Sequence, residues 1–260
     1  MGVSSVAAIN RLPLVEKRAI YRKLIPPEVL AHFNLGDDLR DQDGNELFLI
    51  TGGPGSSDVE LKLYHQHGFR DPIIYGHLTD TLNGQIHVLL YIMNDPGSPR
   101  FDVDQLPDGS PTTFGTRQRN LEAEQAAMQA GLLPGQVRAG LHMLAEARVG
   151  FEVFVKSLGH DRYFLEPLYY HNALIFERYG FSYQRGRRLM ERIHAGFAAG
   201  GELRAKLDDS PFRPRGTAES LRLRSWAIHD GILGEPYSEV TMYRVIGQRE
   251  QVNTAPGVNW

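Results

Sequence analysis

The sequence predicts an α+β fold: an N-terminal antiparallel β-meander of about four strands packed with a helix-rich C-terminal half and two late strands. Apolar residues between positions 46 and 93 alternate with polar ones or form short runs, as they do in strands. Between positions 117 and 246 they recur mainly at helical spacing. Because the strands come first and the helices follow, the order differs from the alternating units of a parallel α/β sheet.

Two hairpins account for the meander. Residues 47–50 form a short apolar run, the turn-forming sequence GGPGSS follows, and residues 59–63 then alternate apolar and charged side chains. Residues 73–80 and 85–93 flank Asn83-Gly84, a dipeptide that suits a type I′ turn because both central residues of that turn have positive φ. The last strand is apolar on both faces, which predicts a central place in the sheet with helices on at least one side.

The turn also predicts a register for the second hairpin. With Leu82 opposite Gln85, His87 lies across from Asp80. His77 and His87 then project from opposite faces of the sheet, so these two histidines do not share a metal ion. We expect His87 and Asp80 to form a cross-strand pair, which contributes up to about 1 kcal/mol.

The chain from 1 to 260 is predicted to be a single domain with a sub-boundary in the loop at 94–116. This loop is rich in proline and glycine, which exclude a helix or a long strand. The sub-boundary separates a β-rich part at 46–93 from a mainly helical part at 117–246.

Helices and two late strands are expected after this loop. The helices are predicted at residues 117–130, from Val137 through Ala145, at 167–179 and at 184–199, and the strands at 221–228 and 239–246. Gly180 ends the third helix and Gly200-Gly201 ends the fourth. The strand at 221–228 is predicted because Leu alternates with Arg there.

Composition excludes several classes of protein and of site. The 260 residues include no cysteine, so disulfides, thiolate metal sites and cysteine nucleophiles are excluded. The near balance of 28 basic and 31 acidic residues argues against a nucleic-acid partner. No apolar run reaches the roughly 18 residues of a membrane helix, and the first residues lack a signal peptide. We therefore expect a soluble, cytoplasmic protein with no membrane partner.

Histidines and glutamates in the helical half form the densest set of candidate metal ligands. Glu191 and His194 have the spacing Glu-x-x-His on one predicted helix, which brings both side chains to one face. Together with Glu166 and His171 they are predicted to hold one divalent metal such as iron or zinc, with water completing the coordination. Glu191 also lies four residues after Arg187, so an ion-paired helix face is the alternative.

The segment from Tyr163 to Tyr183 interleaves aromatic side chains with polar ones. His171 lies there at the edge of a predicted buried helix face, as a general base, a metal ligand or a structural histidine. Tyr170 is expected to orient a substrate, because tyrosine combines an apolar ring with a polar tip. His171 and Tyr170 are therefore the predicted catalytic residues.

These residues predict an enzyme that acts on a small molecule at a His/Glu site, with or without a metal ion. The expected partners are the small-molecule substrate and, in a homo-oligomer, further copies of the chain. A ligand-binding or assembly module that performs no chemistry is one alternative. An acyl-coenzyme A-dependent transferase is another.

The run NALIFERYGF, from Asn172 to Phe181, resembles the closing motif of the GCN5-related N-acetyltransferases, in which Asn and Ala precede an aromatic residue and a final Gly-Phe. The resemblance covers ten residues and implies an acyl-coenzyme A-dependent N-acyltransferase. That family also has a strand followed by an Arg/Gln-x-x-Gly-x-Gly/Ala loop, whose amides bind the coenzyme A pyrophosphate at a helix N-terminus. The nearest match is Gln136–Leu141, which lacks the second small residue. Periodicity predicts helices before Gln136 and after Tyr183, where the family has strands.

Overall fold

The computed structural model describes residues 3–112 and 118–260. The strands are β1 (Phe48–Thr51), β2 (Asp58–Leu63), β3 (Ile74–Asp80), β4 (Ile86–Met93), β5 (Arg162–Leu165), β6 (Ser182–Arg185) and β7 (Thr241–Val245). The α-helices are α1 (Val6–Ile9), α2 (Leu14–Tyr21), α3 (Pro27–His32), α4 (Leu121–Gln129), α5 (Leu144–Ser157), α6 (Tyr170–Arg178), α7 (Arg187–Phe197) and α8 (Leu221–His229).

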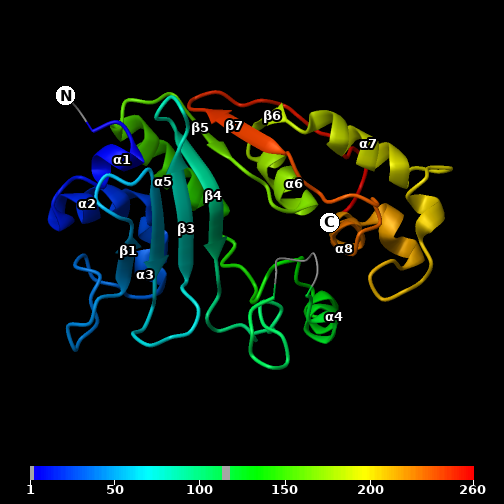
Figure 1. Cartoon of the computed structure of the whole chain (residues 1–260), viewed down its shortest axis with the longest axis horizontal. Coiled ribbons are helices and arrows are strands. Elements are labelled where there is room, and N and C mark those ends of the chain that lie inside the picture. The colour runs from blue at the N-terminus through cyan, green and yellow to red at the C-terminus, as the bar shows by residue number, and fades with distance from the viewer. Residues whose placement is uncertain (1–2, 113–117) are drawn as a thin grey trace. The chain divides into compact units, whose positions relative to one another are not determined.

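The strands form one mixed sheet in the order β1-β2-β3-β4-β5-β7-β6 (Figure 1). Strands β1 to β4 are antiparallel neighbours, which confirms the predicted meander, and β4 is parallel to β5. The late strand predicted at 239–246 is β7. The α+β class is therefore confirmed, and the sheet changes from antiparallel to parallel pairing at β4.

The chain divides into two compact units. Unit 1 contains Met1–Gly97, Gly140–Glu166 and Tyr243–Gln248, and unit 2 contains Ser98–Ala139, Pro167–Met242 and Arg249–Trp260. The first crossing between the units lies inside the loop at 94–116. A single domain with a sub-boundary in this loop stays a prediction.

In unit 1, helices α1, α2, α3 and α5 lie on one face of strands β1 to β4 (Figure 1). The strand pattern explains which face they cover. Along β2, Val59, Leu61 and Leu63 are buried, whereas Glu60 and Lys62 between them are half-buried. Burying this apolar face is the main favourable contribution to the stability of the unit, at about 25 cal/mol per Å² of apolar surface removed from water.

A β-bulge in β4 changes the predicted register between the bulge and the turn, whereas His77 lies opposite Leu90 as the turn predicts. Thr79, and not Asp80, lies opposite His87, because Leu89 is an extra residue with no partner on β3. The extra residue moves the pairing by one position, which carries side chains to the other face of the sheet. His77 and His87 therefore lie on the same face, and the prediction that they lie on opposite faces is wrong.

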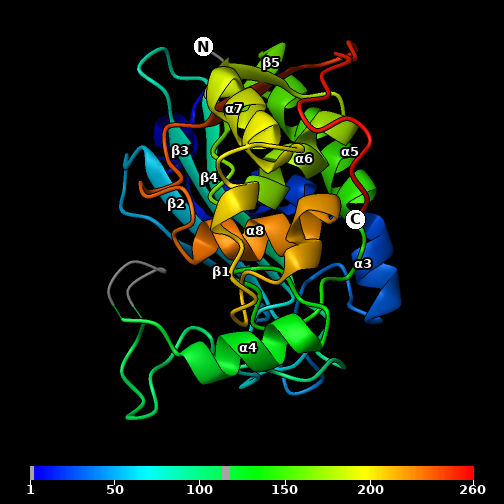
Figure 2. The same ribbon diagram turned by 90° about the vertical axis from the view of Figure 1, so that its right-hand side faces the viewer.

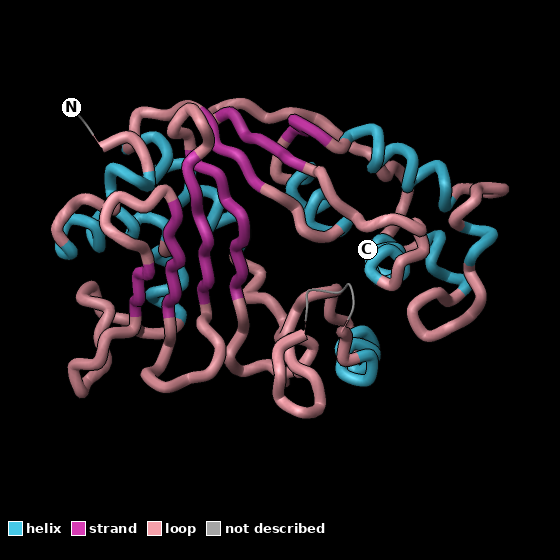
Figure 3. The backbone as a smooth tube through the Cα atoms, in the orientation of Figure 1, coloured by secondary structure: helices cyan, strands magenta, loops and turns pink. Residues whose placement is uncertain are grey.

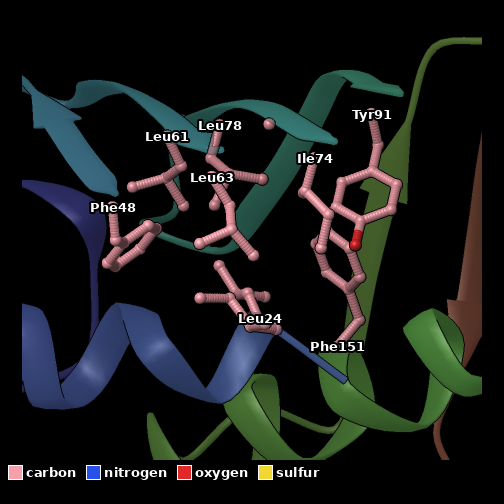
Figure 4. Close-up of a pocket in the computed structure, with 10 residues that line it drawn as sticks. Leu24, Phe48, Leu61, Leu63, Ile74, Leu78, Tyr91 and Phe151 are labelled. Atoms are coloured by element: carbon pink, nitrogen blue, oxygen red, sulfur yellow. The ribbon is translucent and has the colours of Figure 1, made fainter. Parts of the chain in front are cut away.

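The apolar core of unit 1 contains a hollow of about 10 Å³ between the sheet and α5 (Figure 4). Its walls include Leu24, Leu61, Ile74 and Phe151. The hydroxyl of Tyr91, which β4 contributes, is buried there and makes no hydrogen bond. Burial raises the pKa of Tyr91 well above its usual value, so this hydroxyl stays protonated.

In unit 2, helices α6, α7 and α8 lie together (Figure 2), and the ring of Trp226 on α8 is fully buried. The Trp226 indole N–H donates to the Leu132 carbonyl at 2.9 Å. Its ring stacks on Phe212, with the ring centroids 5.5 Å apart. These contacts tie α8 to the segment that follows α4 and to the loop that precedes α8.

Charged side chains also join α4 to α8. The Arg119 guanidinium donates to Glu124 on α4 and, at 2.9 Å, to Asp230, which follows α8. His229 lies 3.1 Å from Glu124, and Arg213 donates to Asp230 at 2.9 Å. Glu124 is 4% exposed. Buried charges require such partners, because an unpaired charge is strongly disfavoured away from water.

Helix α8 replaces the strand predicted at 221–228, so that prediction is wrong. The Leu-Arg alternation is too short to decide the period, and a helix cap precedes it. The Ser220 hydroxyl accepts a hydrogen bond from the Leu223 N–H at 3.4 Å, as an N-cap residue does. In the helix, Arg224 is 3% exposed and its guanidinium Nε donates to the Ala218 carbonyl at 3.0 Å.

Strand β6 replaces the start of the helix predicted at 184–199. Gly186 separates β6 from α7 with a φ of +89°, in the left-handed region that favours glycine. A Cβ at Gly186 would lie 2.8 Å from a methyl carbon of Val240, so the close approach also requires glycine. Helix α7 consequently begins at Arg187, later than predicted.

The helices predicted at 117–130 and 167–179 correspond to α4 and α6, although Arg117 lies outside the described residues. The helix predicted from Val137 begins only at Leu144. Helices α1 to α3 and strand β5 were not predicted. Within residues 3–112 and 118–260, no helix is both long enough and apolar enough to cross a membrane.

Candidate functional site

In unit 1, strand β4 extends beyond its neighbour β5, so β5 covers only part of this edge of β4. Strands β4 and β5 share only two residue pairs, the second of which joins Val88 to Leu165. The Glu166 N–H then donates to the Val88 carbonyl at 3.1 Å, and β5 ends, whereas β4 continues to Met93. The two strands separate beyond this point (Figure 3). No described strand pairs with residues 89–93 on this side, which we call the β4 gap.

Gly140 closes the far end of the β4 gap. It forms an isolated antiparallel bridge with Asn94, the residue after β4. Because the Asn94 N–H donates to the Ile73 carbonyl at 3.0 Å on the β3 side, Gly140 takes the side that β5 has left. A Cβ on Gly140 would lie 3.4 Å from the Met93 carbonyl oxygen, so glycine suits this approach of two backbones.

Helix α5 begins four residues after Gly140, and no side chain caps its N-terminus. Met143 is the N-cap residue and makes no side-chain hydrogen bond, and His142 before it has a φ of +57°. The first bond within the helix runs from the Ala147 N–H to the Met143 carbonyl at 3.0 Å. The N–H groups of the first turn, from Leu144 onward, therefore have no partner within the helix. They lie at the positive end of the helix dipole, an arrangement that binds anions.

His87 and Glu166 form a polar pair where β4 and β5 separate. His87 Nε2 lies 3.5 Å from Glu166 Oε1, and the side chains are 17% and 42% exposed. Nε2 is buried and makes no hydrogen bond. Burial lowers the pKa of His87, and the Glu166 carboxylate opposes that effect only in part. His87 is consequently a neutral imidazole at pH 7, and a carboxylate lies beside it.

The predicted catalytic residue His171 lies in the core of unit 2. It is 3% exposed, its Nδ1 lies 2.8 Å from the Ser225 hydroxyl, and its ring stacks on Tyr169 with centroids 5.6 Å apart. Burial, reinforced by His229, lowers the pKa of His171 to about 3. The histidine is therefore neutral and packed among side chains, the structural alternative named for it above.

Tyr170, the second predicted catalytic residue, begins α6 and is 1% exposed. Burial raises its pKa to about 12, while the nearby guanidinium of Arg224 acts in the opposite direction. The hydroxyl is protonated and enclosed. An orienting role for Tyr170 toward a substrate stays a prediction.

The four predicted metal ligands occupy different surroundings. Glu191 accepts a hydrogen bond from Arg187 at 2.9 Å on an exposed face of α7, which is the ion pair given as the alternative. His194 Nδ1 lies 3.3 Å from the Arg224 guanidinium, whereas Glu166 lies beside His87 in unit 1. Among the described residues, no three or more His, Asp or Glu side chains form a group that could hold a metal ion.

The sequence gives partial evidence for the features of the β4 gap. The sequence indicates Glu166 as a carboxylate within an aromatic segment, and Gly140 belongs to the nearest match to the acetyltransferase loop. The sequence pairs His87 with Asp80, because a run of apolar residues gives no sign of the bulge at Leu89. A glycine shortly before a helix is the only local signal, because Asn94 and Gly140 are far apart in the sequence.

Comparison of the chain with protein-family models, with curated proteins and with solved structures finds no significant match.

Proposed function

We propose that the protein is an acyl-coenzyme A-dependent N-acyltransferase whose coenzyme binds in the β4 gap of unit 1. One observation carries the proposal: Gly140 lies beside the end of β4, so that an uncapped helix N-terminus directly follows an unpaired strand edge. Each part of this arrangement suits a different part of coenzyme A.

The N-terminus of α5 suits the pyrophosphate. Its first N–H groups lack partners within the helix, and the helix dipole favours negative charge at this end. In the sequence, the unit 2 segment Ser98–Ala139 separates β4 from Gly140. In space, however, the loop from Gly140 to α5 leads directly from the end of β4 to a helix.

The unpaired edge of β4 suits the pantetheine arm. That arm is an extended chain with two amide groups, and extended chains pair with open strand edges through backbone hydrogen bonds. Residues 89–93 offer such an edge over roughly 15 Å, at about 3.3 Å per residue. Coenzyme A bound in this way extends from α5 along β4 toward His87, with the thioester at the far end.

At two places where the sequence differs from the acetyltransferase pattern, the structure comes closer to that pattern. The family has a strand before its phosphate-binding loop, and here the end of β4 adjoins Gly140. The family has a strand after its closing motif, and here β6 follows Phe181. The second small residue of the loop is still missing. The adjoining strand and β6 support the resemblance.

His87 and Glu166 supply the acid–base chemistry that an amine acceptor requires. The amine nitrogen attacks the thioester carbonyl, the carbon–sulfur bond breaks, and the coenzyme leaves as a thiolate that takes up one proton. The attacking nitrogen loses a proton, which the neutral His87 accepts. Glu166 Oε1 lies 3.5 Å from Nε2, and a closer approach when substrate binds would let Glu166 accept from Nε2–H and leave the lone pair on Nδ1 for the acceptor. Catalytic contacts often shorten from such apo distances when substrate binds.

Binding of acetyl-coenzyme A to the full chain tests the proposal. We expect saturable binding by calorimetry, with a rise of about 2.7 kcal/mol in unfolding free energy at one hundred times Kd. Pantetheine, which has no phosphate, should bind much more weakly. Absence of saturable binding by acetyl-coenzyme A and by coenzyme A would overturn the proposal.

A carboxylate in the first turn of α5 should weaken coenzyme binding without weakening the fold. We expect Ala145→Asp to lower the affinity for acetyl-coenzyme A about tenfold, because the new charge repels the pyrophosphate but suits the helix dipole. Val149→Asp is the matched control, since it places the same charge one turn later at a position that is 52% exposed. Equal loss of affinity in both variants would argue against pyrophosphate at the helix N-terminus.

The role of His87 is tested separately by turnover with a panel of primary amines, measured as release of free thiol. His87→Ala should lower kcat by a factor of about 10² to 10⁴ and leave acetyl-coenzyme A affinity unchanged. Because burial lowers the pKa of His87, the wild-type rate should stay on its plateau at neutral pH and fall only in more acidic solution. A His87→Ala variant with unchanged turnover would remove the histidine from the mechanism.

A further inference from the structure

Glu177, near the end of α6, is a buried carboxylate in unit 2 that the proposed function does not use. Glu177 is 6% exposed. Oε1 accepts from the Tyr183 hydroxyl at 2.6 Å and from the Thr254 hydroxyl at 2.7 Å. Oε2 accepts from the Thr254 N–H at 3.1 Å. All three donors are neutral, and Oε2 retains a lone pair for one more donor.

Glu177 has no positively charged partner. None of the ion pairs among the described residues includes this carboxylate. Its neighbours respond to the charge: burial and the Glu177 carboxylate together raise the pKa of the Tyr183 hydroxyl far above the usual value. A buried carboxylate without a cation is disfavoured, so a cation that reaches it gains a strong interaction.

A pocket of about 210 Å³ adjoins this carboxylate, between α6, the start of α8 and the C-terminal segment. We call it the Glu177 pocket. Its walls combine the apolar side chains of Leu174, Leu221, Ala255 and Val258 with the polar groups of Glu177 and Asn253. Arg178 also lines the pocket, but its guanidinium lies over the Trp260 ring, 4.4 Å from the centroid.

We propose that the Glu177 pocket binds a small organic ammonium ion with a short aliphatic body. The ammonium group donates to Glu177 Oε2 and supplies the missing positive charge, and the aliphatic body contacts the apolar walls. A bare metal ion is a poorer occupant, because it would leave the apolar walls without contacts. The site lies wholly within unit 2 and does not depend on coenzyme A binding in unit 1.

n-Butylammonium chloride is the probe. We expect saturable binding by the full chain, followed through the backbone amide resonances of Thr254 and Ala255, with a midpoint in the millimolar range or below. Sodium chloride at the same ionic strength tests the charge alone, and n-butanol tests the aliphatic body alone. Neither should give saturable shifts at these amides. Equal binding of n-butanol would overturn the proposal, because it would show that the carboxylate adds nothing.

Three variants separate binding from folding. Ala255→Leu fills the pocket and keeps Glu177 with its hydrogen bonds, so it should abolish n-butylammonium binding while the protein stays folded. Glu177→Gln should also abolish binding, but it weakens the contact with Thr254. Thr254→Val is the matched control, because it removes the hydroxyl bond, keeps the carboxylate and should keep binding. Unchanged n-butylammonium affinity in folded Ala255→Leu would overturn the proposal.

Discussion

Unit 1 and unit 2 differ in how their buried polar groups are satisfied. In unit 2, Glu124, His171 and Arg224 all have hydrogen-bond partners within the unit, whereas the buried hydroxyl of Tyr170 has none. In unit 1, buried polar atoms of His87, Tyr91 and Glu146 have none. His87 and Tyr91 lie on β4, and Glu146 lies in the first turn of α5. A saturated network stabilises one structure, whereas unsatisfied groups beside a strand edge are available to a ligand.

Three of the four predicted metal ligands, His171, Glu191 and His194, lie in unit 2. Histidine and glutamate are dense there because they form structural pairs, such as His229 with Glu124 and Arg187 with Glu191. Buried polar atoms without a hydrogen-bond partner lie on β4 and α5 in unit 1, and Glu177 in unit 2 retains a lone pair for one more donor.

The largest expected effect comes from breaking the charged network of unit 2. Glu124→Ala should lower the free energy of unfolding by about 3 kcal/mol, because it leaves Arg119 and His229 buried without this carboxylate. Chemical denaturation at pH 7 measures the loss. The matched control is Glu191→Ala, which breaks an exposed pair and should change stability by less than about 0.5 kcal/mol.

The same network predicts a loss of stability in acid. Burial raises the pKa of Glu124, but hydrogen bonds from His229 and Arg119 outweigh it, and the net shift is downward. A carboxylate with a lowered folded pKa stabilises the protein above its unfolded pKa and loses that contribution as the pH falls through the folded value. If Glu124→Ala destabilises no more than Glu191→Ala, unit 2 is not held by this network.

The sequence predicts the elements that follow from local patterns, and it predicts less well those that depend on strand pairing, capping or burial. The strands of the meander follow from alternation along β2 and from the Asn83-Gly84 turn, both of which are local. The bulge at Leu89 depends on pairing with β3, and the helix at Leu221 depends on the cap at Ser220 and on burial of Arg224. Neither can be derived from the period of a short apolar run.

The candidate site was less predictable for a similar reason. The β4 gap exists because β5 leaves β4 after Val88 and Gly140 returns to Asn94. Gly140 and Asn94 are far apart in the sequence, so no local pattern records their contact. Only the glycine and the helix after it could be identified in advance, through the acetyltransferase resemblance.

His171 gives the next largest effect and tests whether it is structural. Burial lowers the pKa of His171 in the folded protein to about 3, below the unfolded value near 6.5. Between these two pH values the histidine is protonated in the unfolded chain but not in the folded protein. Stability should therefore be full above pH 6.5 and fall at lower pH by about 1.4 kcal/mol per unit. Urea unfolding at a series of pH values measures the slope. His171→Asn should remove that part of the slope, and an unchanged slope would mean that another group titrates.

Tyr91→Phe should have the opposite effect and raise the free energy of unfolding. The hydroxyl of Tyr91 is buried without a hydrogen bond, so removing it abolishes a desolvation penalty. We expect unfolding free energy to rise by about 1 kcal/mol. Tyr163→Phe offers a comparison on β5, since Tyr163 is also buried but its hydroxyl is not among the buried polar atoms that lack a hydrogen-bond partner. Loss of stability in Tyr91→Phe would show that the hydroxyl has a partner, such as a water molecule in the adjoining hollow.

The smallest expected effect concerns Glu146 and links the unsatisfied groups of unit 1 to the proposed function. Glu146 lies in the first turn of α5, and its Oε2 is buried without a hydrogen bond. A carboxylate here competes with a bound pyrophosphate for the same positive helix end. Glu146→Gln should therefore raise the affinity for acetyl-coenzyme A by about threefold, equal to roughly 0.6 kcal/mol. Calorimetry at low ionic strength, where screening is weakest, gives the clearest measurement.

Glu152→Gln is a poor control because Arg148 and Arg244 bind that carboxylate. Glu28→Gln is the better control, because it removes a charge from α3 and should leave the affinity unchanged. If Glu146→Gln weakens binding, the carboxylate is part of the site and the coenzyme does not use the N-terminus of α5 as a phosphate-binding group.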